Sequence, residues 1–205
     1  MSYPQRLLGF KMFYFKKKSP EPWKSLKIFE IIYLLFLNIP FGGHGQKYPN
    51  SADLSDALFR DANLSNAVLS VSTINNADFS KADLRGAKLT CIYSSNINFV
   101  EAKLCNADLS HSVLIDTSFR CADLSWANFE RADLSNSTFI FNVVSNTIFS
   151  EANLSGAILR AKDLTFDQLS KAKTLYNARL YPELEKQLRD KHPELFEEPK
   201  GPNTS

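Results

Sequence analysis

The 205-residue chain has few of the residues that form metal sites, disulfide frameworks or phosphate-binding loops. Its three cysteines, Cys91, Cys105 and Cys121, are an odd set without C-x-x-C spacing, which indicates neither a zinc site nor a disulfide framework. The three histidines lie far apart in the sequence, and the seven glycines include no glycine-rich phosphate loop. We therefore expect no metal, no cofactor and no catalytic residue, and we expect that the chain is not an enzyme.

The chain also lacks a strong net charge, but its charges are unevenly distributed. The formal net charge is +2, made up of +6 in residues 1–50, −4 in residues 51–164 and zero in residues 165–205. The basic excess therefore belongs to the N-terminal arm alone. A nucleic-acid partner would require a basic surface on the folded part, so no nucleic-acid binding is expected.

No apolar run reaches the ~20 residues of a membrane-spanning helix. The longest, residues 28–41, follows the lysines at 16–18 and precedes a glycine-rich segment. Three interpretations fit this pattern: an export signal, a membrane anchor that makes contact through residues 23–41, or a soluble helix covering the first part of the fold. An exported or membrane-associated location is slightly favoured over a cytoplasmic one.

The rest of the chain is dominated by an internal repeat of five residues. From Ala52 onward the pattern A-(D/N)-L-x-x continues in register through 22 units, with a large apolar residue at the centre of each unit and a small residue two positions earlier. Ser94 alone replaces the apolar centre. A period of five fits neither a helix nor a simple strand, but it fits a chain that turns a corner every five residues.

Residues at intervals of twenty show that four such units make one coil. Phenylalanine recurs at this interval at positions 59, 79, 99, 119 and 139, whereas the positions 64, 84, 104, 124 and 144 contain only aliphatic residues. Coils of three or five units would scatter both patterns. We therefore predict one interior wall of stacked rings and another of aliphatic side chains.

This repeat resembles the pentapeptide-repeat family, and the resemblance covers somewhat more than half of the chain. It implies an all-β solenoid, a right-handed quadrilateral β-helix of between five and six coils, with the central Leu or Phe and the preceding Ala packed inside. Helical N- and C-terminal caps are expected because the ends of a solenoid expose apolar interior and strand edges. Many bacterial members of the family carry a similar segment after their repeats.

The expected organisation has six parts. These are a flexible basic leader (1–22), an apolar helix (23–45), a linker (46–51), the repeat domain (52–164), a helical cap (165–196) and a disordered tail (197–205). In the cap, Thr165 and Gln168 form a capping-box pattern, and Pro182 is typical of the first turn of a second helix. Homodimerisation through an end cap is the alternative use of this region.

Two local features lead to further expectations. Every tenth residue from Asp56 is Asn, Asp or Gly except Trp126, which predicts left-handed backbone at two opposite edges of the coil only. Around residue 94, Ile92 and Ile97 replace small interior residues, so core volume is roughly conserved. Asn142 is predicted to point inward and to need a hydrogen-bond partner.

These features favour a non-enzymatic scaffold or protein–protein interaction module with an unidentified protein partner. Exposed apolar residues on the upper coils mark a contact surface, or they are ordinary isolated surface residues. The alternative function is a DNA-mimicking inhibitor or protector of a type II topoisomerase, as the resemblance to some family members implies. The weak acidity of the repeat domain disfavours it. The candidate contact residues are Tyr93, Val113, Trp126, Phe141 and Val143.

Overall fold

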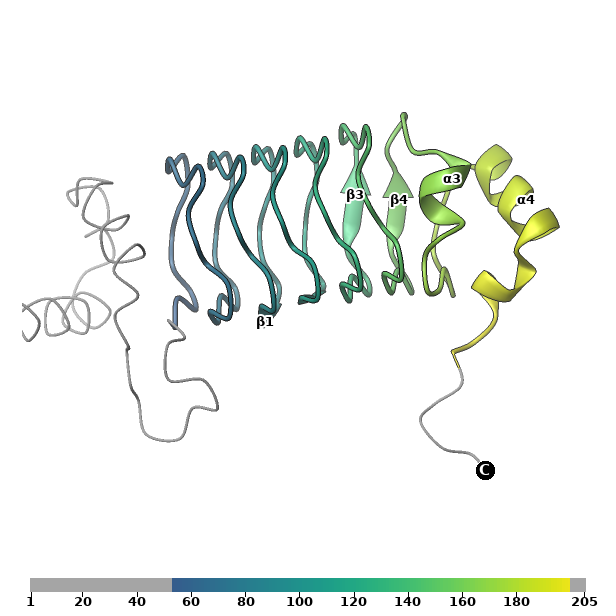
Figure 1. The fold of residues 1–205 in the computed structure, drawn as a ribbon, viewed down its shortest axis with the longest axis horizontal. Coiled ribbons are helices and arrows are strands. Elements are labelled where there is room, and N and C mark those ends of the chain that lie inside the picture. The colour runs from purple at the N-terminus through teal and green to yellow at the C-terminus, as the bar shows by residue number, and fades with distance from the viewer. Residues whose placement is uncertain (1–52, 200–205) are drawn as a thin grey trace, which may run out of the picture.

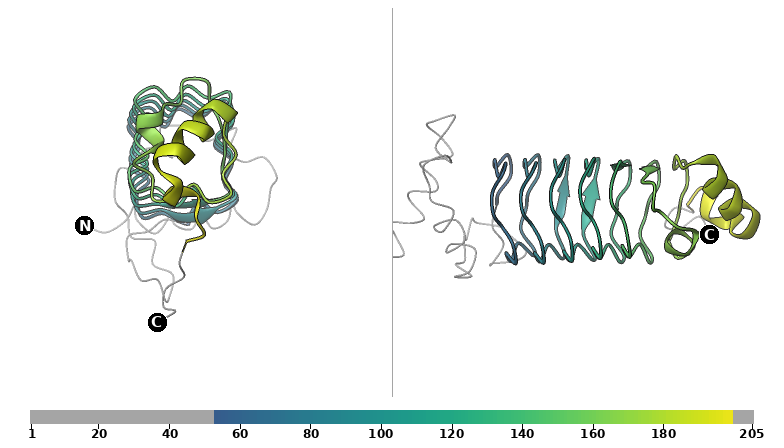
Figure 2. Two further views of the ribbon diagram at one scale, coloured as in Figure 1. Left: turned by 90° about the vertical axis from the view of Figure 1, so that its right-hand side faces the viewer. Right: turned by 90° about the horizontal axis from the view of Figure 1, so that it is seen from above.

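The computed structural model describes residues 53–199, which form a solenoid of stacked coils followed by two α-helices at its C-terminal end (Figure 1). Seen along its axis, each coil has a rectangular outline with four sides (Figure 2). The leader, apolar segment and linker expected from the sequence lie outside the described residues. Within residues 53–199, no helix combines the length and the hydropathy that crossing a membrane requires.

Residues twenty apart lie side by side in neighbouring coils, as the sequence predicts. Parallel bridges join Asp53 to Thr73 and Leu58 to Asp78, and the same offset continues to the pair Asp133 and Asn153. We number the four sides by their inward residues in the first coil. The first side contains Leu54, the second Phe59, the third Leu64 and the fourth Leu69, each with every twentieth residue that follows.

Each side is held to the next coil mainly through one outward residue. The N–H of Phe59 donates to the carbonyl of Asp78 (2.7 Å), and the N–H of Asp78 donates to the carbonyl of Ala57 (2.9 Å). Because the chain turns a corner after every five residues, these pairs seldom extend into strands. Within residues 53–199 there are four strands of three residues in two parallel pairs: β1 (Tyr93–Ser95) with β2 (Val113–Ile115), and β3 (Thr138–Ile140) with β4 (Ile158–Arg160).

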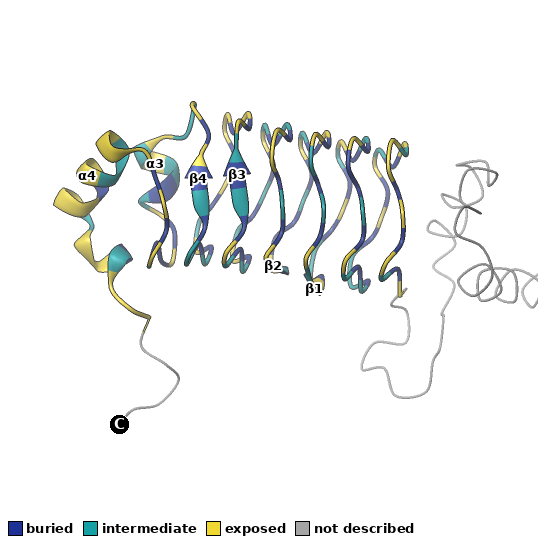
Figure 3. Cartoon of the chain, turned by 180° about the vertical axis from the view of Figure 1, so that it is seen from behind, coloured by how far each residue is buried: buried dark blue, intermediate teal, exposed yellow. Residues whose placement is uncertain are grey.

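The interior of the solenoid is a continuous apolar core, and buried and exposed residues alternate along each side (Figure 3). The predicted ring column is confirmed: Phe59, Phe79, Phe99, Phe119 and Phe139 stack with centroid separations between 4.8 and 5.3 Å. The aliphatic column on the third side is buried as well. On the fourth side Phe129 and Phe149 form a second stack, whose rings meet the first column edge-on.

The irregular positions are buried as the sequence predicts. Ile92 and Ile97 fill interior positions with at most 1% exposure, and Ser94 is buried between them. The Ser94 hydroxyl accepts a hydrogen bond from the N–H of Ile74 in the preceding coil (2.8 Å). Asn142 points inward, and its amide donates to the carbonyls of Phe119 and Ala122.

The predicted restriction of left-handed backbone to alternate corners is wrong. Asp56 and Asn66 have φ near 59°, but so do the intervening corners, including Asp61 (57°) and Val71 (66°). At two of the alternate corners the residue type fits the same corner one coil away. Asn76 donates to the Asp56 carboxylate (3.1 Å), and a Cβ at Gly86 would lie only 2.6 Å from the Asn66 side-chain oxygen.

Coil pairing continues past residue 164, where the sequence predicted the end of the repeats. Asn153 pairs with Thr174 and Ile158 with Arg179, each twenty-one residues apart. The extra residue breaks the five-residue register, which is why the pattern alone assigned residues 172–180 to the cap. Between these pairings lies α3 (Phe166–Leu169), whose N-terminus carries the predicted capping box of Thr165 and Gln168.

After the last paired segment the chain forms α4 (Pro182–Lys191) and the 3₁₀ helix η2 (Pro193–Phe196). Helix α4 begins at the predicted proline. It lies across the C-terminal end of the solenoid (Figure 2). Leu188 and Leu195 are buried in the same apolar cluster as the coil interior, and the carbonyl of Leu195 accepts from the N–H of Leu175 (2.6 Å).

Candidate protein-binding surface

The outward residue before the central position is Asp or Asn in nearly half of the units, and there its side chain bonds to the backbone of its own side. Its oxygen accepts a hydrogen bond from the N–H two residues later, as Asp133 does from Ser135 (3.0 Å) and Asn153 from Ser155 (3.1 Å). This bond explains the second position of the repeat motif, since the next outward N–H would otherwise face only water. The same bond is made by residues 53, 63, 78, 83, 98, 108, 123 and 128.

Two of these aspartates also form ion pairs. Arg85 contacts the Asp83 carboxylate at 2.6 Å, and Arg60 contacts Asp78 at 3.2 Å. The hydrogen bond from the Arg85 side chain lowers the pKa of Asp83. Burial raises the pKa of Asp78, but the Ser80 backbone N–H and Arg60 outweigh it, so its pKa is also lowered. Both carboxylates are therefore ionised and engaged within the protein rather than free for a ligand.

The candidate contact residues do not form one surface. Tyr93 and Val113 are paired between β1 and β2 on the first side. Phe141 occupies the corner between the second and third sides, Val143 lies on the third side, and Trp126 occupies the corner between the third and fourth sides. The first and third sides are opposite each other in the four-sided coil (Figure 2). A single partner surface could therefore contact either the first-side pair, Tyr93 and Val113, or the three residues on and beside the third side.

The larger group forms a patch around the third side of the C-terminal coils. The backbone N–H of Trp126 donates to the carbonyl of Ser145 in the next coil (2.9 Å). Trp126 therefore lies beside Ser145, which is two residues along the chain from Val143. Ile148 follows on the fourth side. We call Trp126, Phe141, Val143 and Ile148 the third-side patch. Their exposed fractions are 60%, 61%, 48% and 44%.

Two exposed apolar residues were missed in the sequence. Leu58 and Val68 lie on opposite sides of the first described coil and are 50% and 46% exposed. Both occupy the outward position that is polar in most units, so a search of that position for apolar residues would have found them. They are separated by the third side and do not join the third-side patch.

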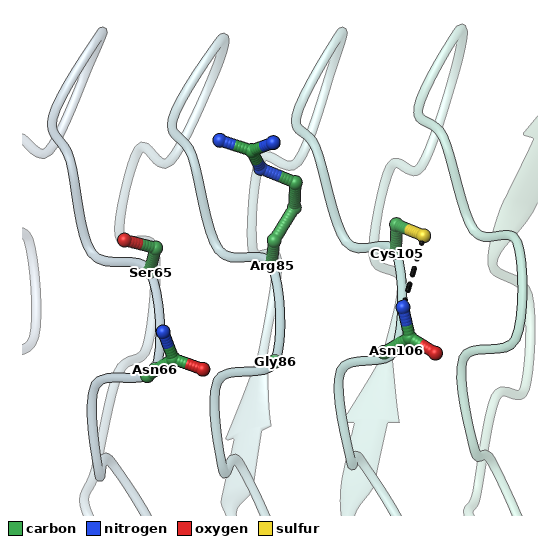
Figure 4. A pocket seen from close by; sticks show the side chains of 6 residues that line it. All are labelled: Ser65, Asn66, Arg85, Gly86, Cys105 and Asn106. Carbon is green, nitrogen blue, oxygen red and sulfur yellow. Dashed lines mark hydrogen bonds between the residues drawn. The ribbon is translucent and has the colours of Figure 1, made fainter.

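A shallow hollow lies at the corner that follows the third side in the early coils (Figure 4). It has a volume of about 390 Å³ and forms where Gly86 has no side chain between Asn66 and Asn106. Its only charged lining residue, Arg85, is already paired with Asp83. The hollow therefore brings no set of titratable groups together. Nor do residues 53–199 contain a cluster of His, Cys, Asp and Glu that could hold a metal ion.

Comparison with known proteins identifies the repeat. A family model described as pentapeptide repeats matches residues 52–90 and 97–136 in eight copies. The gap between the two matched stretches includes Ser94, the irregular centre. No curated protein matches the chain in sequence.

Three solved structures are similar to this chain. A pentapeptide repeat protein from Nostoc has 26% identity and a TM-score of 0.43, covering 64% of this chain and 86% of its own. HetL from Nostoc, described as involved in heterocyst differentiation regulation, has 24% identity and a TM-score of 0.41, covering 62% and 70%. A pentapeptide repeat protein of the Arabidopsis thaliana thylakoid lumen has 20% identity and a TM-score of 0.33, covering 77% and 85%.

Both matched stretches begin at the first residue of a five-residue unit, and the central residues of the units within them are inward residues of the four sides. Over residues 52–90 and 97–136 the chain consists of pentapeptide repeats of this family.

Proposed function

We propose that the protein is a non-enzymatic scaffold that binds another protein through the third-side patch. The observation that supports this is the replacement of backbone-capping Asp or Asn by Val143 and Ile148, next to exposed Trp126 and Phe141. Elsewhere on the solenoid that outward position is mostly polar, and in half of the units its side chain is bonded to the backbone of the chain itself. Clustered exposed apolar side chains on a soluble surface are typical of contact sites.

The aromatic members of the patch have the properties of interface anchors. Trp126 and Phe141 are large and about 60% exposed, and both occupy corners with positive φ, of 61° and 58°. A left-handed backbone disfavours bulky side chains, so the fold gives no stability reason for aromatics there. Tryptophan and other aromatics often dominate the binding energy of interfaces.

Capture of partners by matched variants tests this proposal. The full chain would be immobilised as wild type, as Trp126→Asn with Phe141→Ser, and as Tyr93→Ser on the opposite side. Tyr93 and Phe141 are equally exposed at 61%, so the third protein controls for loss of a surface aromatic. We expect the double variant to lose a partner that the Tyr93 variant retains. Equal capture by all three proteins would contradict the proposal.

A second candidate, mimicry of DNA toward a type II topoisomerase, has weaker support. A mimic needs an acidic track free to face the enzyme, whereas the aspartates at the outward position before the centre of a unit are bonded to backbone N–H groups, and Asp78 and Asp83 also to arginines. A supercoiling assay with DNA gyrase and the purified chain distinguishes the two candidates. Inhibition at micromolar protein would favour mimicry over the scaffold.

For the finer architecture, we propose a right-handed β-helix of between five and six coils, with α4 and η2 as a helical cap. Burial of Leu188 and Leu195 against the coil interior supports the cap. Homodimerisation through this end is the alternative use of the same surface. Light scattering of the purified chain tests it, since a capped end predicts a monomer and an end-to-end interface predicts a dimer.

A further inference from the structure

The second side of the C-terminal coils carries basic and apolar side chains but no acidic ones. Its outward positions from residue 118 onward form two adjacent columns, which the pairing of β3 with β4 aligns. We call this surface the β3–β4 face; both strands lie on it in Figure 1. Its outward residues are Ser118, Arg120, Thr138, Ile140, Ile158, Arg160, Arg179 and Tyr181.

The three arginines surround the apolar residues of this face. Arg160, in the coil that follows Ile140, is paired with Ile140 across the two strands. Arg120 lies in the coil that precedes Ile140, where the N–H of its neighbour Cys121 donates to the Ile140 carbonyl (2.9 Å). Arg179 pairs with Ile158 in the other column. With coils about 4.8 Å apart, Arg120 and Arg160 lie roughly 10 Å from each other.

These arginines have no counter-charge within residues 53–199. All three are exposed, and none forms an ion pair there. By contrast, Arg60 and Arg85 in the early coils are both paired with aspartates. The acidic residue Glu101 lies at a corner of a lower coil and is paired with Lys81 at 3.7 Å.

The mixture of side chains favours a protein over other polyanions. A nucleic-acid surface would present more cations along a continuous track, and isoleucines between the cations would contribute little to it. An apolar centre with arginines around it matches the composition of protein interfaces, in which arginine is enriched. Guanidinium groups pair with carboxylates through two parallel hydrogen bonds. Phe141, at the edge of this face, also belongs to the third-side patch.

We propose that the β3–β4 face binds an acidic, apolar segment of a partner protein, with Asp or Glu side chains of the segment on Arg120, Arg160 and Arg179. The inference rests on the proposed scaffold function and specifies the chemistry of the partner. If the segment binds in this way, the β3–β4 face on the second side and the third-side patch form one continuous binding surface that meets at Phe141.

Binding of synthetic probes to the full chain tests this proposal. The probes are two labelled peptides with the same apolar residues, one carrying Asp and the other Lys between them, an oligothymidylate, and vesicles of phosphatidylcholine and phosphatidylserine. The proteins are the wild type, Arg120→Glu with Arg160→Glu, and Arg131→Glu with Lys88→Glu. The last pair changes the same charge at exposed sites away from the second side, because Lys88 lies on the fourth side and Arg131 at its corner.

We expect the wild type to prefer the Asp peptide and the double arginine variant to bind it at least tenfold more weakly, reflecting two lost charge-assisted contacts. The control pair should retain most of the affinity. Equal losses in both variants, preference for the oligothymidylate or the vesicles, or no binding of the Asp peptide would each overturn the inference. Circular dichroism establishes that every variant is folded. Loss of the cellular partner only in the third-side variants would retain the scaffold function and refute this inference.

Discussion

The coils at the two ends of the described solenoid share one backbone but use their side chains differently. In residues 53–92 the outward aspartates bond to the chain and pair with arginines, and one stack of rings fills the interior. In residues 133–180 the outward residues are more apolar, their arginines have no ion pair within the described chain, and two stacks of rings meet inside. In the early coils these aspartates and arginines are therefore engaged within the chain, although Leu58 and Val68 are exposed there, whereas the late coils leave both arginines and apolar side chains available to a partner.

Removing one ring from each end should have the largest effect. Phe79 contacts two rings of its own stack, whereas Phe139 stacks on Phe119 and meets Phe129 and Phe149 edge-on. Truncation of a buried Phe to Ala costs about 3–5 kcal/mol, and aromatic pairs add about 0.5–1.5 kcal/mol each. We expect Phe139→Ala to lower the free energy of unfolding more than Phe79→Ala. Urea denaturation measures both, and equal losses would show that the second stack adds no stability.

The ring stacks also show what the sequence can establish. Interior periodicity correctly predicted the stack on the second side, because inward side chains twenty residues apart lie next to each other in neighbouring coils. The second stack, of Phe129 and Phe149, was not predicted. Corner geometry was predicted only in part, since Asp61 and Val71 adopt the same φ as Asn66 although their residue types do not suggest it. Their conformation is imposed by pairing with the next coil, as in the hydrogen bond from Val71 N–H to the Thr90 carbonyl (3.0 Å).

Of the five candidate contact residues, Val113 is half-buried and the other four are exposed. Tyr93 and Val113 are neighbours as the sequence predicts, but the placement of the two groups on opposite sides was not predicted. Tyr93 and Trp126 are equally conspicuous in the repeat pattern, yet they lie on different sides of the coil. The arginines of the β3–β4 face were not identified, because the net charge of the whole repeat domain obscures a local basic surface. The position of Arg179 on that face depends on one extra residue between Asp163 and Lys171, the segment that contains α3, which the five-residue register cannot anticipate.

Corner residues should give a smaller effect that separates stability from binding. Val71 and Phe141 both have positive φ, of 66° and 58°, which costs a bulky side chain about 1–2 kcal/mol. Asparagine tolerates this conformation better. We expect Val71→Asn and Phe141→Asn each to raise the free energy of unfolding by up to about 1 kcal/mol. Only Phe141→Asn should weaken partner binding.

Thermal unfolding and the capture assay together check this pair. If Phe141→Asn destabilised the protein, the aromatic would have a structural role in the late coils. It would then give no support to the view that this surface is retained for binding at the expense of stability.

The ion pair of Asp83 in the early coils should give the smallest effect, one that depends on pH. Arg85 lowers the pKa of Asp83 below its ordinary value of 3.8. Ionised Asp83 therefore adds stability that is present above pH 3.8 and is lost as the pH falls through the lower pKa of the folded state. Because Arg85 is 60% exposed, solvent screening limits this contribution to a few tenths of a kcal/mol, or about 1 kcal/mol at most.

Asp83→Asn tests this contribution, since asparagine keeps the side-chain oxygen that accepts from the backbone N–H, as Asn63 does from Ser65 (3.2 Å). The variant should lose stability at neutral pH, and the loss should shrink as the pH falls below 3.8. Urea midpoints at neutral and acidic pH measure the change, and Arg85→Gln should reproduce most of it. If the loss of stability stayed constant with pH, the Asp83 side chain would stabilise the early coils through its packing and not through its charge. The contrast with the unpaired arginines of the late coils would then no longer be one of charge.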